Sequence, residues 1–223
     1  MTDSIAERIA QIRAAIPPEV RLVAVTKTVS VEAIRLAYEA GVRDFGENRV
    51  QEAEAKQLQL QDLRDITWHL IGHLQSNKAA TAIANFDWLH SVDSWKLAQR
   101  LDRLAREQSR CPRICLQVKI LPDPNKYGWT VPELLADLPQ LNACESLNIQ
   151  GLMTIPPQGL TETQTRSVFE KTRQLAAEIG AQNWSNIKMA ELSMGMSGDY
   201  LLAVEAGATM IRPGQIIFGP RNI

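Results

Sequence analysis

Short apolar runs alternate with longer amphipathic segments along almost the whole chain, and this alternation constrains the fold more than any other feature. The strand-like runs lie at residues 21–26, 42–46, 66–72, 86–91, 113–120, 148–153, 188–193 and 208–214. Helical patterns separate them at residues 30–41, 47–60, 75–84, 93–108, 131–141, 161–180 and 197–207, and another amphipathic helix opens the chain. Strands that alternate with helices indicate a parallel sheet, because parallel neighbours need a crossover connection.

Eight strand candidates in 223 residues predict a (β/α)8 barrel, a fold of about 250 residues. We therefore expect an α/β protein with a modified TIM barrel, a single domain over residues 1–223 and an extra N-terminal helix. A doubly wound sheet would alternate in the same way, but no Gly-x-Gly-x-x-Gly loop follows the first strand. No linker or low-complexity tract divides the chain.

Charge and terminal patterns exclude several classes of protein. The formal net charge is −1, from 24 Lys and Arg against 25 Asp and Glu, so bulk charge does not favour nucleic acid or an anionic membrane. Asp3, Glu7 and Arg8 interrupt the opening apolar residues, which excludes a signal peptide. No apolar run approaches the roughly 18 residues of a membrane span. We expect a cytoplasmic protein whose three cysteines are reduced thiols.

In a barrel of this kind, functional groups gather where the strands end. Polar or special residues follow all eight predicted strands: Lys27; Glu47 and Asn48; Gly72 and His73; His90 and Ser91; Lys119; Met153 and Thr154; residues 193–197; and residues 212–214. Closure of the barrel puts the last strand beside the first. We therefore expect the segment of Arg212 to neighbour Lys27.

The segment ELSMGMSGDY at residues 191–200 has features of a phosphate site. Ser193 and Ser197 offer hydroxyl groups, Gly195 and Gly198 let the backbone approach a ligand, and the pattern predicts a helix that begins near Ser197. The N-terminus of a helix offers unpaired N–H groups to an anion. Gly214 in RPGQ predicts a second turn whose backbone N–H groups can donate to the anion. The alternative is a flexible turn capped by serine.

Lys27, at the end of the first predicted strand, suggests a Schiff base with a phosphorylated aldehyde. Its amine must be neutral to attack a carbonyl, and both desolvation and a nearby cation such as Arg212 would lower its pKa. Pyridoxal 5′-phosphate carries both an aldehyde and a phosphate. A barrel-type aldolase acting on a sugar phosphate would fit the same pattern, and so would an exposed lysine that merely ends a strand.

The pair His69 and His73, four residues apart in HLIGH, would suit a metal only on a helix. Here the pattern predicts a strand, in which both side chains would point to one face. We therefore expect no metal site.

Six motifs together resemble the pyridoxal phosphate homeostasis protein family. They are AVTK (24–27), FGENRVQE (45–52), WHLIGHLQSNK (68–78), GLM (151–153), LSMGMSGD (192–199) and IRPGQIIFG (211–219). The resemblance covers essentially the whole chain. It implies a barrel similar to the N-terminal domain of alanine racemase, with pyridoxal phosphate as the cofactor.

The resemblance also implies roles for individual residues. Lys27 would form the Schiff base, Asn48 would lie near the cofactor ring and its 3-hydroxyl, and Arg212 would face the pyridine nitrogen. The phosphate side would be lined by Ser193, Gly195, Met196, Ser197 and Gly214, with Gln215 beside them. His73 and Met153 would line the pocket more loosely. An arginine that donates but does not readily release a proton should leave the pyridine nitrogen unprotonated.

The family resemblance implies a non-catalytic protein of intracellular vitamin B6 and amino-acid balance. A racemase needs a second acid or base, which alanine racemases take from an added C-terminal domain and a partner subunit. This chain ends at Ile223, just after the last predicted strand, so we expect no such domain and a monomer. Apo-enzymes that use the cofactor are candidate partners. The alternative is a small racemase or decarboxylase with His73, His90 or Tyr127 as the missing base.

Overall fold

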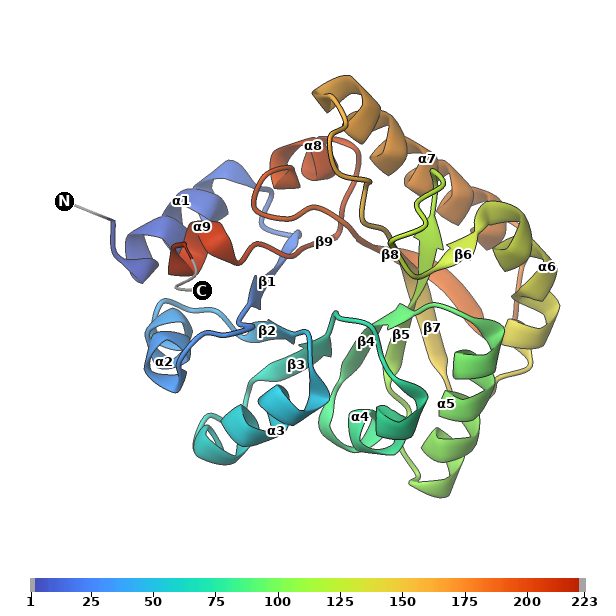
Figure 1. Cartoon of the computed structure of the whole chain (residues 1–223), viewed down its shortest axis with the longest axis horizontal. Helices are drawn as coiled ribbons and strands as arrows, with labels where there is room; N and C mark the ends of the chain where they lie inside the picture. Colours follow the sequence, from blue (N-terminus) through green and yellow to red (C-terminus); the bar gives the residue numbers. More distant parts are fainter. Residues whose placement is uncertain (1–2, 221–223) are drawn as a thin grey trace.

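The computed structural model describes residues 3–220 and contains a barrel of parallel strands surrounded by helices (Figure 1). Within that range, eight strands form the barrel: β1 (Arg21–Val25), β2 (Asp44–Glu47), β3 (Thr67–Leu70), β4 (Trp88–Val92), β5 (Arg113–Lys119), β7 (Asn148–Met153), β8 (Ile187–Ser193) and β9 (Met210–Ile211). They pair in parallel in this order, and pairing of β9 with β1 closes the sheet. The predicted modified (β/α)8 barrel is confirmed.

The helices form an outer ring around these strands (Figure 1). They are α1 (Ile5–Ala15), α2 (Val31–Glu39), α3 (Val50–Gln59), α4 (Ala79–Asn85), α5 (Trp95–Glu107), α6 (Val131–Asn142), α7 (Glu162–Gly180), α8 (Tyr200–Glu205) and α9 (Gln215–Phe218), with a short 3-10 helix at Ser76–Lys78. The predicted N-terminal helix is α1. The single-domain assignment stays a prediction, and the ends of its range, residues 1–2 and 221–223, lie outside the described residues.

Capping residues fix where several helices begin. The hydroxyl of Ser30 accepts a hydrogen bond from the Ala33 N–H at the start of α2. Thr130 with Glu133, and Thr161 with Gln164, form reciprocal capping boxes at the starts of α6 and α7. These side chains satisfy N–H groups that have no partner within the helix.

The sequence misses two short elements and predicts the starts of α3, α4 and α8 three or four residues too early. Strand β6 (Trp129–Thr130) pairs with the end of β5, and helix α9 follows β9. Helix α3 begins at Val50 rather than residue 47, because β2 continues through Glu47. Helix α8 begins at Tyr200, which corrects the start expected near Ser197. Residues 197–199 form a turn instead, across which the Met196 N–H donates to the Asp199 carboxylate.

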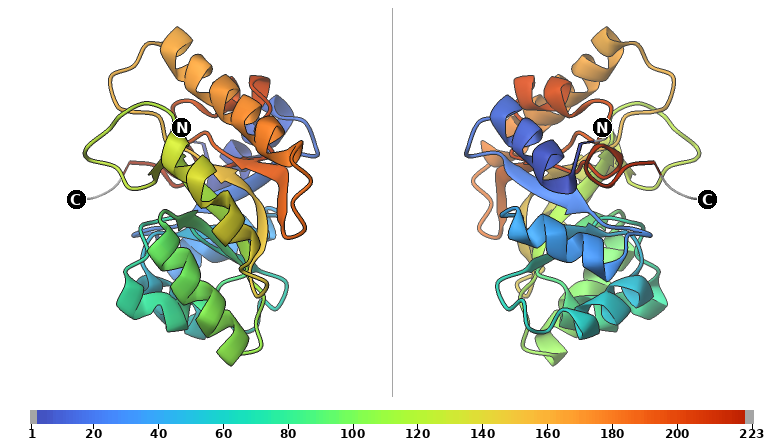
Figure 2. Two further views of the ribbon diagram at one scale, coloured as in Figure 1. Left: turned by 90° about the vertical axis from the view of Figure 1, so that its right-hand side faces the viewer. Right: turned by 90° about the vertical axis from the view of Figure 1, so that its left-hand side faces the viewer.

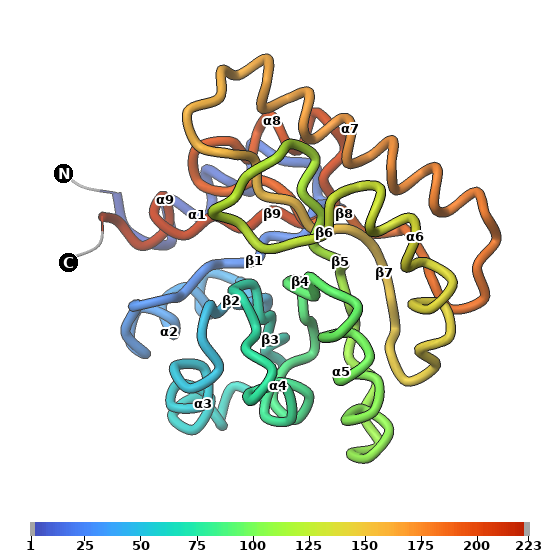
Figure 3. The backbone as a smooth tube through the Cα atoms, turned by 45° about the vertical axis from the view of Figure 1, so that its right-hand side comes forward, coloured from blue at the N-terminus to red at the C-terminus, as the bar shows by residue number. Residues whose placement is uncertain are grey.

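The first and last described helices lie side by side at the outside of the barrel (Figures 1 and 3). The guanidinium of Arg8 in α1 donates to the carbonyl of Ile217 in α9 over 3.1 Å. This contact joins the two ends of the chain on the side where β1 meets β9. None of the helices between residues 3 and 220 is long and apolar enough to cross a membrane.

Alternate residues of each strand point to opposite sides of the barrel wall. Leu22 and Ala24 of β1 belong to the large core between strands and helices, whereas Val23 faces the interior. Five buried apolar side chains form a small interior cluster: Val23, Trp88, Cys115, Met153 and Met210. The rest of the interior includes the buried polar residues His69, His90 and Ser193.

Two loops project from the same end of the barrel (Figure 2). One joins β5 to β6, and the other follows β7. The ammonium group of Lys126 in the first loop donates to the carbonyls of Ile155 and Pro156 in the second. Tyr127 stacks on His73, with 3.5 Å between the ring centroids. These contacts tie together loops that surround the C-terminal ends of the strands.

Candidate functional site

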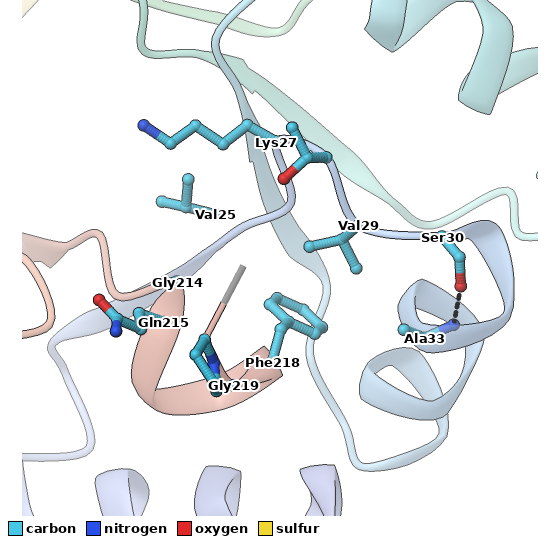
Figure 4. A pocket seen from close by; sticks show the side chains of 11 residues that line it. Val25, Lys27, Val29, Ser30, Ala33, Gly214, Gln215, Phe218 and Gly219 are labelled. Carbon is cyan, nitrogen blue, oxygen red and sulfur yellow. Dashed lines mark hydrogen bonds between the residues drawn. The ribbon is translucent and has the colours of Figure 1, made fainter. Parts of the chain in front are cut away.

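Lys27 lies in the turn that follows β1. Thr26 is buried, and its N–H donates to the Gly46 carbonyl of β2 over 2.9 Å, so the backbone is fixed up to this point. Lys27 lines a cavity of about 240 Å³ between residues 25–33 and residues 214–220. Figure 4 shows its side chain extending past Val25 on the side of the cavity where Gly214 lies. The geometry therefore brings Lys27 and Gly214 to one cavity.

A buried ionic cluster holds the turn that carries Lys27. The ammonium group of Lys56 donates to the Thr26 carbonyl over 2.6 Å and to carboxylate oxygens of Glu47 and Glu52, each over 2.7 Å. Glu52 also accepts from the Thr28 N–H, whose residue has a φ of 62°. Burial raises the pKa of Glu47 and outweighs the hydrogen bonds from Lys56 and Thr26, which lower it.

The segment after β9 lies directly against β1, as expected. The Val25 N–H donates to the Pro213 carbonyl over 2.9 Å. A Cβ atom on Gly214 would lie 3.0 Å from the Val25 carbonyl oxygen, a contact so tight that a side chain here would push the two segments apart. The N–H groups of Gly214 and Ile216 both point to the Ser197 hydroxyl, at 3.1 and 3.4 Å. Two backbone donors thus converge on one oxygen at this edge.

The loop between β8 and α8 differs from the expected helix N-terminus. Met196 is exposed, and its N–H donates to the Asp199 carboxylate over 2.6 Å, so this donor already has an acceptor. Gly195 is buried against Ala203, whose Cβ would lie 2.6 Å from a Cβ at position 195. The donors nearest Ser197 therefore come from residues 214 and 216, and not from a helix that begins at residue 197.

Arg212 and Ser193 meet inside the mouth of the barrel. Arg212 is buried, and its guanidinium donates to the Ser193 hydroxyl over 2.6 Å and to the Thr154 carbonyl over 2.9 Å. Burial lowers the pKa of Arg212 to about 10. The side chain therefore remains a cation at neutral pH. Ser193 also contacts His90, at 2.6 Å.

Three other predicted residues do not line the cavity of Lys27. Asn48 and His73 line a separate cavity of about 400 Å³, and His73 contacts the Asp93 carboxylate at 2.8 Å. Met153 is fully buried in the apolar cluster of the barrel interior. The expectation that His69 and His73 share one face is wrong. His69 lies in β3 and is buried, whereas His73 lies in a loop beyond the end of that strand.

Sequence reasoning missed the contacts between elements. It placed Glu47 at a strand end without its partner Lys56, although Glu52 and Lys56 have the i, i+4 spacing of a helix ion pair. It noted His69 and His90 separately without their mutual contact at 2.8 Å. Within residues 3–220, no three His, Cys, Asp or Glu side chains come together in a way that could hold a metal ion.

Comparison with known proteins identifies the family of this chain. The model of the alanine racemase N-terminal domain matches residues 1–222. A pyridoxal phosphate homeostasis protein from Synechocystis is 52% identical over 95% of this chain and 96% of its own length. The chain belongs to the pyridoxal phosphate homeostasis protein family. This membership agrees with the six motifs that suggested it.

Solved structures extend the comparison. PipY from Synechococcus elongatus, in a structure with pyridoxal phosphate bound, has a TM-score of 0.93 and 55% identity, covering 97% of this family member and all of that chain. Alanine racemase from Clostridium difficile has a TM-score of 0.80 but only 14% identity, and the match covers 99% of this chain and 58% of the racemase. The racemase therefore shows the shared fold alone.

Proposed function

We propose that this chain binds pyridoxal 5′-phosphate through a Schiff base on Lys27 and serves as a non-catalytic protein of vitamin B6 homeostasis. The observation that carries the proposal is the single cavity shared by Lys27 and Gly214, next to the donors that converge on Ser197. Family membership supports it, since a relative with 55% identity has a structure with this cofactor bound.

The residues present fit the chemistry of the cofactor. Its aldehyde needs an amine, and formation of the Schiff base replaces the carbonyl oxygen by the Lys27 nitrogen and releases water. Its phosphate needs several donors. The N–H groups of Gly214 and Ile216 donate to the Ser197 oxygen in the absence of the cofactor, and they would donate to phosphate oxygens in its place, beside the Ser197 hydroxyl. The lysine and these donors belong to adjoining segments because β9 pairs with β1.

The remaining predicted residues complete the proposal. Arg212, a buried cation at the barrel mouth, would face the pyridine nitrogen and leave it unprotonated. Ser193, Gly195 and Met196 would lie towards the phosphate side, and Asn48 towards the ring. His73 and Met153 would act at a greater distance. When bound, the cofactor would supply an electron-withdrawing ring.

The environment of the candidate bases favours a carrier over a racemase or decarboxylase. His90 is fully buried, and its burial, together with His69 and the cations Arg212 and Arg21, holds its pKa well below the ordinary value. Tyr127 and His73 stack on each other, and His73 also contacts Asp93. His90 thus has no contact with solvent, and His73 and Tyr127 are engaged with each other and with Asp93. The proposal therefore gives the chain no second base for proton transfer.

Titration with pyridoxal phosphate tests the proposal. The protein should develop an absorbance band near the edge of the visible range, and Lys27→Ala should lose that band while phosphate contacts retain some binding. Lys126→Ala is the matched control, because this lysine lies at the same end of the barrel but donates to the Ile155 and Pro156 carbonyls. An unchanged band in Lys27→Ala would contradict the proposal.

The carrier assignment has its own test. With amino acids in deuterated water, the cofactor-loaded protein should not exchange the α-protons of the amino acids rapidly. Rapid exchange would instead establish the racemase or decarboxylase alternative. A cytoplasmic location, a monomeric state and transfer of the cofactor to apo-enzymes belong to the same proposal, and sedimentation of the loaded protein checks the monomer.

A further inference from the structure

Five side chains form a continuous series of polar contacts through the interior of the barrel. The Arg212 guanidinium lies 2.6 Å from the Ser193 hydroxyl, which lies 2.6 Å from Nδ1 of His90. Nε2 of His90 lies 2.8 Å from Nδ1 of His69, and Nε2 of His69 lies 2.9 Å from Asp44. We call these five residues the interior relay.

The interior relay runs from one end of the barrel to the other. Asp44 is the first residue of β2, and Ser193 is the last residue of β8. His69 and His90 lie within β3 and β4 and are fully buried. Barrels of this kind usually fill their interior with branched apolar side chains. Polar groups buried in that position destabilise the folded state unless each one is hydrogen-bonded. The five side chains therefore depend on one another for their hydrogen bonds.

The Asp44 end and the neutral state of the two rings together determine the direction of these hydrogen bonds. The Asp44 carboxylate can only accept, so the Nε2–H of His69 donates to it. With both rings neutral, as their burial favours, Nδ1 of His69 accepts from the Nε2–H of His90, and Nδ1 of His90 accepts from the Ser193 hydroxyl. Ser193 also accepts from Arg212, which can only donate.

Burial supports the neutral state of both rings. It lowers the pKa of His69, although Asp44 opposes this effect, and it lowers the pKa of His90 well below the ordinary value. Other charges also face the rings. Arg21 of β1 acts on both, Asp87 acts on His69 from the loop before β4, and Arg212 acts on His90.

The far end of the relay reaches the opposite surface of the barrel. Asp44 is partly exposed, with 18% of its side chain accessible, and it contacts the Arg21 guanidinium at 3.4 Å. The Arg21 and Arg113 guanidinium groups lie 5.5 and 5.3 Å from the centre of the Trp88 ring. A buried cation at the cofactor end is thus linked by directed hydrogen bonds to a carboxylate at the other end.

We propose that Asp44, His69, His90 and Ser193 are positioning residues for Arg212, and that they fix the orientation of its guanidinium and couple it to the charge of Asp44. The inference rests on the proposed function where it assigns Arg212 to the pyridine nitrogen of the cofactor. The relay itself is a property of the protein without cofactor.

Nitrogen NMR of the histidine rings in the cofactor-free protein tests the relay directly. The chain has three histidines, so His73→Gln leaves only the two rings of the relay. Both should show a protonated Nε2 and an unprotonated Nδ1 at neutral pH. A proton on Nδ1 of either ring, or an imidazolium, would overturn the relay whether or not the protein binds pyridoxal phosphate.

Asp44→Asn in the loaded protein tests the coupling. Loss of the negative charge of Asp44 should leave the positive charge of Arg212 less compensated. The pH at which the absorbance change of the bound cofactor is half complete should then fall by about half a unit or more. Asp87→Asn is the matched control. It removes the same charge near His69, but the Asp87 carboxylate accepts from the Trp68 N–H and not from a histidine of the relay.

The outcomes separate this inference from the proposed function. A shift in Asp44→Asn with little shift in Asp87→Asn supports the coupling. Equal shifts, or none in a protein that still binds the cofactor on Lys27, would overturn the coupling and leave the proposed function standing. Failure of the wild-type protein to bind on Lys27 would overturn the proposed function and the coupling to the cofactor, while the NMR result would still decide the relay.

Discussion

Gly214 is the residue at which sequence and site geometry agree most closely. It was expected to supply a donor turn, and its N–H points to Ser197 while its backbone packs against Val25. The small size of this residue matters because β1 lies so close to it.

Gly214→Ala should weaken binding of pyridoxal phosphate. The new methyl group would lie 3.0 Å from the Val25 carbonyl oxygen, so the donor turn would move away from β1. If the overpacking of about 1–3 kcal/mol has to be restored on binding, affinity falls by roughly 5- to 150-fold. Equilibrium titration measures the change. Gly180→Ala at the end of α7 is the control, since a Cβ at that position would lie at an ordinary contact distance of 3.6 Å from Met189. Equal affinities in the two variants would refute this role of Gly214.

Single residues could be predicted where one strand end or one motif identified them, as for Lys27, Ser193 and Arg212. Their partners could not. The contact between Lys56 and Glu47 joins a helix to a strand, and the contact between His69 and His90 joins two strands across the barrel interior. Local pattern does not encode such pairs, because they depend on strand register and on which way each side chain points.

At the scale of the element, the turn between β1 and α2 depends on α3. Lys56 of α3 bonds to the Thr26 carbonyl and to Glu47, and 9% and 0% of the Lys56 and Glu47 side chains are exposed. Glu52 of the same helix accepts from the Thr28 N–H. The position of Lys27 is thus set by a helix that contributes nothing to its cavity.

Lys56→Met should destabilise the protein by about 3–5 kcal/mol at neutral pH, because it leaves the carboxylate of Glu47 buried without its cation. The loss should shrink in acid, since a protonated Glu47 needs no cation. Urea unfolding measures it. The surface pair of Arg35 and Asp62 provides the control, and Arg35→Met should cost far less. Similar losses in both variants would contradict the role assigned to the cluster.

Strands β3 and β4 carry the buried histidines, and these predict a pH dependence of stability. Burial lowers both pKa values, so below about pH 6.5 the unfolded chain binds protons that the folded chain does not. The free energy of unfolding should therefore fall between pH 6.5 and 5, by up to about 1.4 kcal/mol per pH unit for each histidine. His90→Gln should reduce this slope. A flat profile for the wild-type protein over this range would refute the prediction.

The regular elements were predictable because each carries a strong periodic pattern. Strand β7 occupies residues 148–153 as predicted, and α6 and α7 begin within one residue of their expected starts. The errors lie in short elements. Strand β6 has two residues that follow a Pro-rich loop, and α9 has four, so each contains about one period of its pattern and neither pattern repeats.

At the scale of the whole molecule, closure of the barrel creates the candidate site. Lys27 follows the first barrel strand, and Gly214 follows the last. They share a cavity only because β9 pairs with β1, and the contact between Arg8 and Ile217 reinforces that junction from outside. The same closure encloses the interior relay that ends at Arg212. One architectural feature therefore explains both the lysine site and the buried polar interior.

Borohydride reduction followed by peptide mass spectrometry tests the central claim most directly. Reduction would convert the bond between Lys27 and pyridoxal phosphate into a stable amine, so a single pyridoxyl-phosphate adduct should appear on the peptide that contains Lys27 and be absent from Lys27→Ala. An adduct on another lysine in the wild-type protein, with Lys27 unmodified, would contradict the account.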